Sequence, residues 1–444
     1  MKLVCLIHRN TSYKYFTPLV QEALNRGHEV ECWHNYNHPT WGTKVHYFPY
    51  LDCAPKFKND KTLKMDKFSS YEDLKNKIRQ DKDIDVVFSM QAFHIDMPGE
   101  NLDDLHCRWA TIISGLDNFI DLRDTNIGGK RTNKEIFYVY SEHFLELGRK
   151  YLESLFPDKL NSLSEDYIEI QCPGTLEFDS FAGIDPESVR KKYGIPDGKD
   201  VFMYLPFPYA NRSKSAWERA FCGMDVNTYK HKGEGFDHKR KNPFWLDTAQ
   251  KACSLMKIIR EKTPRQYYFN GWTEKEVFSA VRKFCDHNNL YLVVKARLKF
   301  PVAQSVQKNA DLMIWDDENE QNPPILKELL MLSKVYMGCC STAVMTSAFA
   351  GVYSVNLDVP EEFFVSETAR YWFSGKFTTM FDFPGIVSTW SIERVIKEFS
   401  AKSLQDFRVD SDRRSEYLKL YCGYGDFNTS NRILDDVESH LIMK

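Results

Sequence analysis

Short apolar runs of strand length alternate along this chain with stretches long enough for helices. The first such unit consists of KLVCLI, a polar loop HRNTSYKYF, an amphipathic segment PLVQEALNRG and a second run HEVECWH. Apolar residues at Leu19, Val20, Ala23 and Leu24 give the third segment a helical period, and Gly27 is a typical helix end. A strand, a helix and a strand in this order predict a βαβ unit and therefore a parallel sheet.

The same alternation continues in two series that a turn-rich stretch after Pro173 separates. Further strands are expected at residues 84–90, 108–114, 137–141, 200–205, 291–296, 311–315, 334–338 and 353–357, and further helices at 186–193, 246–261, 273–288, 325–332 and 341–350. A chain of 444 residues is too long for one core of ordinary size. We therefore predict an α/β fold with two Rossmann-like lobes.

The domain limits follow from the same pattern. We expect an N-terminal Rossmann-like acceptor domain over residues 1–172 and a second Rossmann-like domain over 173–410, with an insertion at 208–245. Residues 411–444 are expected to form C-terminal helices, because the tail ends in an amphipathic stretch.

Composition excludes several classes of protein. The net charge is −3, so no global basic field favours a nucleic-acid partner. The first apolar run stops at His8, which is too short for a signal peptide, and no segment reaches the ~20 apolar residues that cross a bilayer. The 11 cysteines include no CxxC pair and favour reduced thiols over a zinc site or disulfides. We expect a cytoplasmic protein without a metal or cofactor of its own.

The strand-to-helix junctions narrow the choice of ligand. The loop after the first strand is HRNTSY rather than GxGxxG, and GxxxxGK[ST] is absent from the sequence, which argues against dinucleotide and P-loop sites. Small residues instead gather from Cys339 to Thr342, between the expected strand KVYMG and the helix AVMTSAFAG. Free backbone N–H groups at such a junction favour an anion, and Ser341 or Thr342 can cap the helix and contact the ligand. A helix cap with close packing explains the same residues without a ligand.

Five weak motifs in the second half occur in a recognisable order. They are CPGTLEFDSF, VRKKYGIPDGKDVFMYLPFPYANR, YLVVKARLKFP, WDDENEQNPPILKELLMLSKVYMG and CCSTAVMTSAFAGVYSVNL, which span residues 172–357. Together they resemble the nucleotide-binding lobe of GT-B glycosyltransferases, in particular the branch of capsule and teichoic-acid polysaccharide transferases and UDP-N-acetylglucosamine 2-epimerase. The resemblance implies two lobes with a cleft between them, and final helices that pack back toward the first lobe.

The resemblance also implies a donor site for a nucleotide-sugar. A metal-independent site of this kind meets the diphosphate charge with helix N-termini and cationic side chains. The residues implied in donor binding are Lys295, Arg297, Asn322, Pro324, Ile325, Ser341, Thr342 and Arg212, with Asp316, Asp317 and Glu328 as weaker candidates for hydroxyl contacts. Lys295 and Arg297 lie at the carboxyl end of an expected parallel strand, where open α/β sheets bind ligands, and a solvated pair at the strand end is the alternative.

Three departures from the family pattern concern the site. Leu298 replaces the histidine of the motif KpHP, and Cys339 and Cys340 stand where relatives often show an acidic residue and a serine. The motif HG of the first lobe has no match, and the nearest place holds Ser114 and Gly115. The resemblance therefore assigns no catalytic base.

Candidates for the base come from loops after the strands of the first lobe. An inverting transfer needs a base within hydrogen-bond reach of the acceptor hydroxyl. We rank Asp117 and His94 first and His8 next, and Glu142 is a further candidate. A histidine in such a loop is more often a structural or exposed residue than a base, and a retaining transfer needs no strong base.

The segment 211–242 is rich in basic and aromatic residues. It suits an anionic acceptor, a lipid headgroup or a peripheral membrane contact, and a solvated loop explains it equally well. Three functions remain open for the chain. The first is sugar transfer from a nucleotide-sugar to a carbohydrate or lipid-linked acceptor of a surface glycan. The second is a CDP-alditol phosphotransferase or nucleotide-sugar epimerase, and the third is a non-catalytic binding subunit of the same fold.

Overall fold

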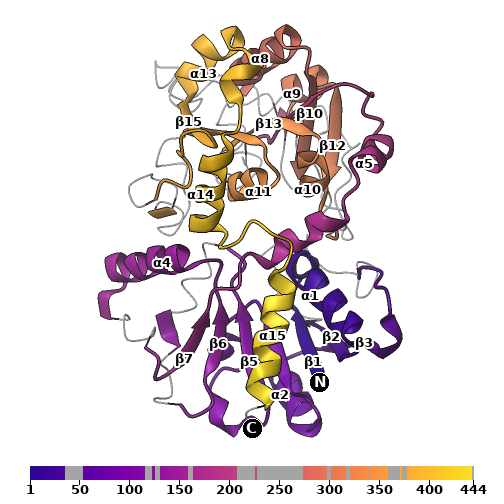
Figure 1. Cartoon of the computed structure of the whole chain (residues 1–444), viewed down its shortest axis with the longest axis vertical. Helices are drawn as coiled ribbons and strands as arrows, with labels where there is room; N and C mark the ends of the chain where they lie inside the picture. The colour runs from indigo at the N-terminus through magenta and orange to yellow at the C-terminus, as the bar shows by residue number, and fades with distance from the viewer. Residues whose placement is uncertain are drawn as a thin grey trace, which may run out of the picture. The chain divides into compact units, whose positions relative to one another are not determined.

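A computed structural model of the chain describes residues 1–35, 54–115, 123–125, 131–158, 164–207, 226–227, 274–297, 302–316, 321–339, 341–358, 371–372 and 378–442. The chain divides into two compact units (Figure 1). The first comprises Met1–Gly183, Asn319–Pro324 and Ser415–Lys444, and the second comprises Ile184–Glu318 and Ile325–Arg414. Each unit is built around a parallel sheet, which confirms the predicted α/β fold with two Rossmann-like lobes.

The first unit holds a seven-stranded sheet whose strands are all parallel. Its strands are β1 (Lys2–Ile7), β2 (Glu29–Asn35), β3 (Leu63–Phe68), β4 (Val86–Ser89), β5 (Arg108–Ile112), β6 (Glu135–Tyr138) and β7 (Ile168–Gln171). They lie in the order β3-β2-β1-β4-β5-β6-β7. The direction of winding reverses between β1 and β4, and open α/β sheets bind ligands at the carboxyl ends of such strands.

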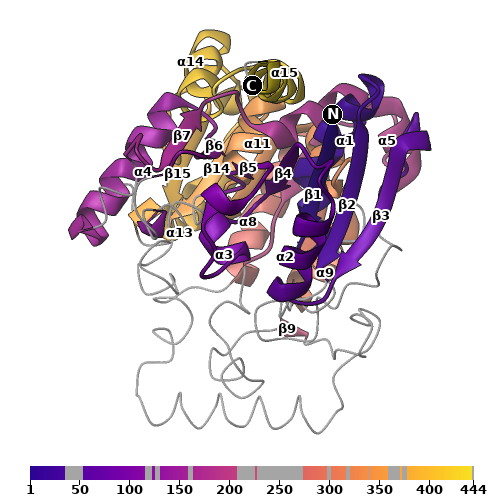
Figure 2. The ribbon, with the colours of Figure 1, turned by 90° about the horizontal axis from the view of Figure 1, so that it is seen from below.

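Helices cover both faces of this sheet. They are α1 (Tyr13–Asn25), α2 (Tyr71–Gln80), α3 (Phe93–Asp96), α4 (Glu142–Leu155) and α15 (Thr429–Ile442). Residues of α1 and α15 share one hydrophobic core with the sheet, and residues of α2 and α3 share another on the opposite face (Figure 2). Arg26, just after α1, bonds to Asp435 and Glu438 of α15 at 2.6 and 3.2 Å. The last helix of the chain thus completes the core of the first unit.

Helix α1 begins at Tyr13, five residues before the start expected at Pro18. The proline lies inside the helix and removes one backbone hydrogen bond without ending it. Tyr13 and Phe16 are fully buried, and burying two aromatic side chains offsets the lost bond. The expectation of a loop over HRNTSYKYF is therefore wrong for its second half.

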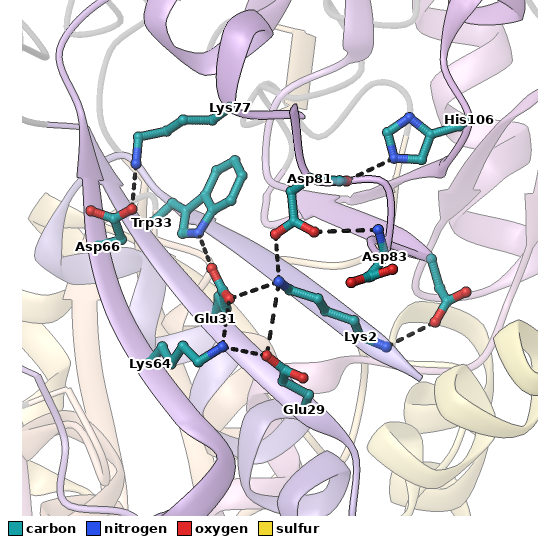
Figure 3. A network of polar contacts seen from close by, with 11 residues as sticks. Lys2, Glu29, Glu31, Trp33, Lys64, Asp66, Lys77, Asp81, Asp83 and His106 are labelled. Atoms are coloured by element: carbon teal, nitrogen blue, oxygen red, sulfur yellow. Dashed lines mark hydrogen bonds and ion pairs between the residues drawn. The ribbon is translucent and has the colours of Figure 1, made fainter. Parts of the chain in front are cut away.

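A charged network joins the strands at the amino end of the first sheet (Figure 3). The Lys2 ammonium contacts Asp81 and lies 3.0 Å from Glu31 and 3.8 Å from Glu29. Trp33 Nε1 donates to Glu31 at 2.8 Å. Burial lowers the pKa of Lys2, but the hydrogen bonds with Asp81 and Glu31 outweigh burial and raise it above its usual value. This network fastens β1 to β2 at the opposite end from the switch point.

The second unit holds a six-stranded parallel sheet in the order β12-β10-β8-β13-β14-β15. Its strands are β8 (Val201–Tyr204), β10 (Tyr291–Arg297), β12 (Leu312–Asp316), β13 (Ser333–Cys339), β14 (Tyr353–Asp358) and β15 (Val387–Ser391), and β9 (Val226–Asn227) pairs with β11 (Val302–Ala303) apart from it. The winding reverses between β8 and β13. The carboxyl ends of these two strands are the second expected ligand position.

The remaining helices of the described chain are α5 (Pro186–Tyr193), α8 (Glu274–His287), α9 (Gln304–Asn309), α10 (Ile325–Leu330), α11 (Ala343–Phe349), α13 (Ile392–Glu398) and α14 (Ser411–Tyr421). Short 3-10 helices lie at Asn10–Ser12, Asp60–Thr62, Leu102–Asp104, Leu176–Gly183, Phe399–Ala401 and Leu404–Phe407. The helix expected at 246–261 falls outside the described residues. In the part of the chain that is described, no helix is both long enough and apolar enough to cross a bilayer.

Candidate functional site

A buried histidine and aspartate meet at the switch point of the first sheet. His8 follows β1 directly, Ser89 ends β4 and Asp96 ends α3. His8 Nε2 lies 3.1 and 3.2 Å from the two carboxylate oxygens of Asp96. Ser89 Oγ donates to the same carboxylate at 2.5 Å. Asp96 is fully buried and His8 is 6% exposed, so a buried ion-pair geometry links β1 to the β4–α3 segment.

This geometry assigns the proton on the His8 ring. A carboxylate accepts hydrogen bonds, so Asp96 places the ring hydrogen on Nε2. The other ring nitrogen, Nδ1, then carries no hydrogen and accepts a hydrogen bond from the Asn35 amide, whose Nδ2 lies 3.3 Å away. When Nδ1 takes up a proton, the Asp96 carboxylate stabilises the imidazolium that forms. His8 can act as a general base through Nδ1 once an acceptor hydroxyl takes the place of the Asn35 amide at that nitrogen.

His94 lies two residues before Asp96 in α3 but in a different environment. Burial lowers the pKa of His94, and the charge of Arg131 lowers it further while Asp124 opposes both. Its Nδ1 atom is buried and makes no hydrogen bond with the described residues. Of the two histidines, His8 is thus the one with a carboxylate in hydrogen-bond contact.

The other candidates for the base are less informative. Asp117 lies outside the described residues. Ser114 and Gly115, which stand in place of the motif HG, follow β5, and the Ser114 carbonyl accepts a hydrogen bond from Tyr15 Oη at 2.5 Å. Glu142 is exposed in the first turn of α4, where a carboxylate complements the helix dipole.

A second charged pair lies at the carboxyl end of the second sheet. Lys295 of β10 and Asp316, the last residue of β12, approach to 2.5 Å, and each side chain is only 10% exposed. The carboxylate offsets the cost of burying the ammonium. Arg297 ends β10 beside Asp316 in the register of the two strands. The structure thus brings two predicted cations, Lys295 and Arg297, to one edge of the sheet.

Ser341 and Thr342 lie between the end of β13 and the start of α11. Ser341 Oγ accepts a hydrogen bond from the backbone N–H of Ala343, the first residue of α11, at 3.2 Å, although the N-cap position of this helix is Thr342. Thr342 is exposed and its side chain makes no capping bond. Because β13 adjoins β8, these hydroxyls lie at the switch point of the second sheet.

The remaining donor-site candidates lie at a boundary between the two units or outside the described residues. Asn322 is exposed and Pro324 forms an isolated bridge with Gln321. Both belong to the first compact unit, and the boundary to the second unit falls at Ile325, the first residue of α10. Arg212, Asp317 and Cys340 lie outside the described residues, as does the segment 211–242 except for β9.

Glu328 forms hydrogen bonds with two residues at the end of α5. Its carboxylate accepts hydrogen bonds from Lys192 at 3.0 Å and from Tyr193 Oη at 2.5 Å, both at the end of α5. These contacts fasten α10 to α5 and do not favour a ligand role for Glu328.

The sequence pattern misses the partners of these groups. Asp96, Ser89 and Asn35 complete the surroundings of His8, yet their spacing from His8 carries no signal. Asp96 is the acidic residue of SMQAFHID and stands near His94 in the sequence. Its contact with His8, however, depends on the order of the strands in the sheet. Among the described residues, no group of three or more His, Cys, Asp or Glu side chains is placed to hold a metal ion.

In sequence, the chain matches no family model and no curated protein. Solved structures match it in fold. The wall teichoic acid polymerase TagF aligns over 100% of this chain and 89% of its own length, with 10% identity and a TM-score of 0.50. A variant of TagF aligns with 9% identity and a TM-score of 0.51. The protein UGT89C1 of Arabidopsis thaliana aligns over 98% of this chain and 99% of its own, with 9% identity and a TM-score of 0.50. The fold is therefore that of the GT-B class, as the resemblance in sequence implied.

Proposed function

We propose that this protein is a glycosyltransferase that moves a sugar from a nucleotide-sugar donor to a hydroxyl of a carbohydrate acceptor, without a metal. The GT-B fold and two chemically different sites at switch points support this function. The observation that carries it is the buried His8–Asp96 pair, because an imidazole held by a carboxylate is an arrangement that suits proton abstraction from a hydroxyl.

In this proposal the first unit removes the acceptor proton. The acceptor hydroxyl loses its proton to His8 Nδ1 as its oxygen attacks the anomeric carbon of the donor sugar. Asp96 holds the ring through Nε2 and balances the charge that His8 gains. The contact with Asp96 favours His8 over His94 as the base, whereas the sequence ranked Asp117 and His94 ahead of His8; Asp117 stays a prediction.

The second unit holds the donor in this proposal. Negative charge grows on the diphosphate as its bond to the anomeric carbon breaks, and fixed cations and hydroxyls stabilise that charge. Lys295 and Arg297 supply the cations, and Ser341 and Thr342 supply hydroxyls at the second switch point. Asp316 orients the Lys295 ammonium. Arg212, a lipid-linked form of the acceptor, a cytoplasmic site of action and a membrane contact through 211–242 remain predictions.

A nucleotide panel tests the proposal. We would measure the Tm of the protein with UDP-, GDP-, CMP- and CDP-linked compounds and then analyse the products with carbohydrate acceptors. One nucleotide is expected to raise the Tm, and its sugar is expected to appear on an acceptor. Epimerised donor without transfer, or transfer of an alditol phosphate with release of CMP, would replace the proposal with the second function. Absence of any nucleotide response in the intact protein would overturn all three nucleotide-dependent reactions.

A further inference from the structure

A buried glutamate holds the start of the helix that carries Asp96. Glu135 is the first residue of β6 and is fully buried. Its Oε1 atom accepts hydrogen bonds from the Phe93 backbone N–H at 2.8 Å and from Thr111 Oγ1 at 2.7 Å. Phe93 is the first residue of α3, and Asp96 is its last. Glu135 therefore touches one end of α3 while the other end contacts His8.

Thr111 connects the same glutamate to the turn that precedes α3. Its hydroxyl lies 2.7 Å from Glu135 Oε1 and 3.1 Å from the Gln91 carbonyl oxygen. A hydroxyl has one hydrogen, so Thr111 donates to one of these acceptors at a time. Gln91 N also donates to Ser89 Oγ at 3.0 Å. The turn from β4 to α3 is thus held through Glu135, Thr111 and Ser89 together.

Glu135 is costly to keep in this position. Burial raises the pKa of Glu135 to about 7, with the negative charge of Asp96 adding to the effect. The hydrogen bonds from Thr111 and Phe93 and the charge of Arg131 oppose it. Its second oxygen, Oε2, is buried and makes no hydrogen bond with the described residues. A buried carboxyl group with an incomplete set of hydrogen bonds does not favour stability, so its contacts point to another role.

We infer that Glu135 is a positioning residue for the proposed base: it anchors α3 through the Phe93 N–H and so keeps Asp96 against His8 Nε2. This inference rests on the proposed function of His8. The ionised carboxylate gives Phe93 a charge-assisted hydrogen bond, which is stronger than a neutral one. A protonated Glu135 donates to Thr111 instead, and the Thr111 hydrogen then turns to Gln91. Protonation thereby weakens the hold on α3.

The charges that face Glu135 set the pH range of this effect. Arg131 precedes β6 and favours the ionised form, and Asp96 on α3 favours the protonated form. Thr111 on β5 also contacts Glu135 but carries no charge. The transfer rate is therefore expected to rise as the pH passes through about 7, the pKa of Glu135.

Glu135→Gln is the main test, because glutamine keeps an acceptor oxygen and loses the charge. We expect kcat at pH 8 to fall about tenfold and the KM for donor to change by less than about twofold. The part of the pH dependence of kcat that comes from Glu135 should disappear, while the part that comes from the His8 base remains. The ¹⁵N signals of the His8 ring, assigned by their loss in His8→Ala, should show less hydrogen on Nε2. Thr111→Val keeps the carboxylate and should shift the same signals in the same direction by a smaller amount.

Glu274→Gln is the matched control. Glu274 is a buried glutamate of the second unit that accepts hydrogen bonds from a hydroxyl, Tyr204 Oη, and from a backbone N–H, Phe207 N, both at 3.0 Å. Its replacement should leave the His8 signals unchanged. Unchanged His8 signals in both Glu135→Gln and Thr111→Val would overturn the inference. The signals are read without substrate, so a protein that transfers no sugar yet shows the shift would contradict the proposed function and leave the positioning role in place.

Discussion

At the carboxyl end of each parallel sheet a basic side chain pairs with a buried aspartate, but the two basic groups differ. In the first unit the pair is His8 and Asp96, at 3.1 Å, and in the second it is Lys295 and Asp316, at 2.5 Å. An imidazole exchanges a proton easily near neutral pH, whereas a lysine ammonium acts as a fixed point charge. The first pair therefore suits proton transfer and the second suits an anionic ligand. The proposed function thus assigns different chemistry to two pairs that lie at similar places in the two sheets.

The largest effect is expected from replacing Asp96, the carboxylate of the His8–Asp96 pair. Asp96→Asn replaces an acceptor by an amide that is able to donate to Nε2, so His8 adopts the wrong tautomer. We expect kcat to fall by roughly 10²–10⁴ with little change in donor affinity. Steady-state kinetics with saturating donor would measure it. Ser89→Ala removes only one hydrogen bond from the same carboxylate and is the control, with a smaller loss expected. Equal losses in the two variants would contradict a special role for the His8–Asp96 contact.

The next effect concerns the unfolding free energy of the protein and comes from Glu135 in the first unit. Its pKa is about 7 in the folded protein against an ordinary 4.5. The folded state therefore binds the proton more tightly than the unfolded state, and this contribution to stability is lost as the pH rises from 4.5 through 7. Between pH 5 and 8 the wild type should lose up to about 3 kcal/mol of unfolding free energy relative to Glu135→Gln. Urea denaturation at both pH values would test this, and parallel pH dependences would refute it.

Breaking the second pair should affect binding rather than proton transfer. Lys295→Ala removes the proposed diphosphate contact, and we expect donor affinity to fall about 10- to 100-fold. Isothermal titration with the donor nucleotide would measure the change. The control is Lys192→Ala, which breaks a lysine–carboxylate contact with Glu328 in the same unit. If both variants weaken the nucleotide equally, the loss reflects general destabilisation and Lys295 has no specific role.

The smallest effect should come from the charged network at the other end of the first sheet. Lys2→Met leaves Glu31 with the hydrogen bond from Trp33 Nε1 and with the longer ion-pair contact to Lys64, at 3.4 Å. We expect a loss of about 1–2 kcal/mol in unfolding free energy and no change in turnover below the melting range. Lys77→Met breaks a more exposed pair with Asp66 and should cost less. A change in kcat for Lys2→Met would show that the two ends of the sheet are not independent.

Strands that are buried on both faces could be predicted from the sequence. Strands β1, β10 and β13 are nearly continuous apolar runs, as parallel sheets require. Strand β3 could not be predicted, because LKMDKF alternates with charges and buries only Phe68 at the edge of the sheet. The early start of α1 was hidden by Pro18, which is a common first residue of a helix.

The two sites were predictable only in part, for a similar reason. His8, Lys295 and Ser341 follow or end recognisable strands, so their place at the carboxyl edge could be deduced. The contact of His8 with Asp96 spans 88 residues, and that of Glu135 with Phe93 spans 42. Both contacts depend on β4, β5 and β6 lying in order beside β1. That order is set by packing of the whole sheet and not by the local pattern.

The central claim is that the first unit transfers a proton and the second binds a nucleotide-sugar. The most direct test measures donor affinity and donor-saturated transfer rate side by side in wild type, His8→Ala and Lys295→Ala. His28→Ala is the control, because His28 contacts Glu438 at 2.8 Å far from the switch point. We expect His8→Ala to keep the wild-type donor affinity and to lose roughly 10²–10⁴ in rate, while Lys295→Ala loses affinity. A His8→Ala protein that transfers sugar at the wild-type rate would contradict the account.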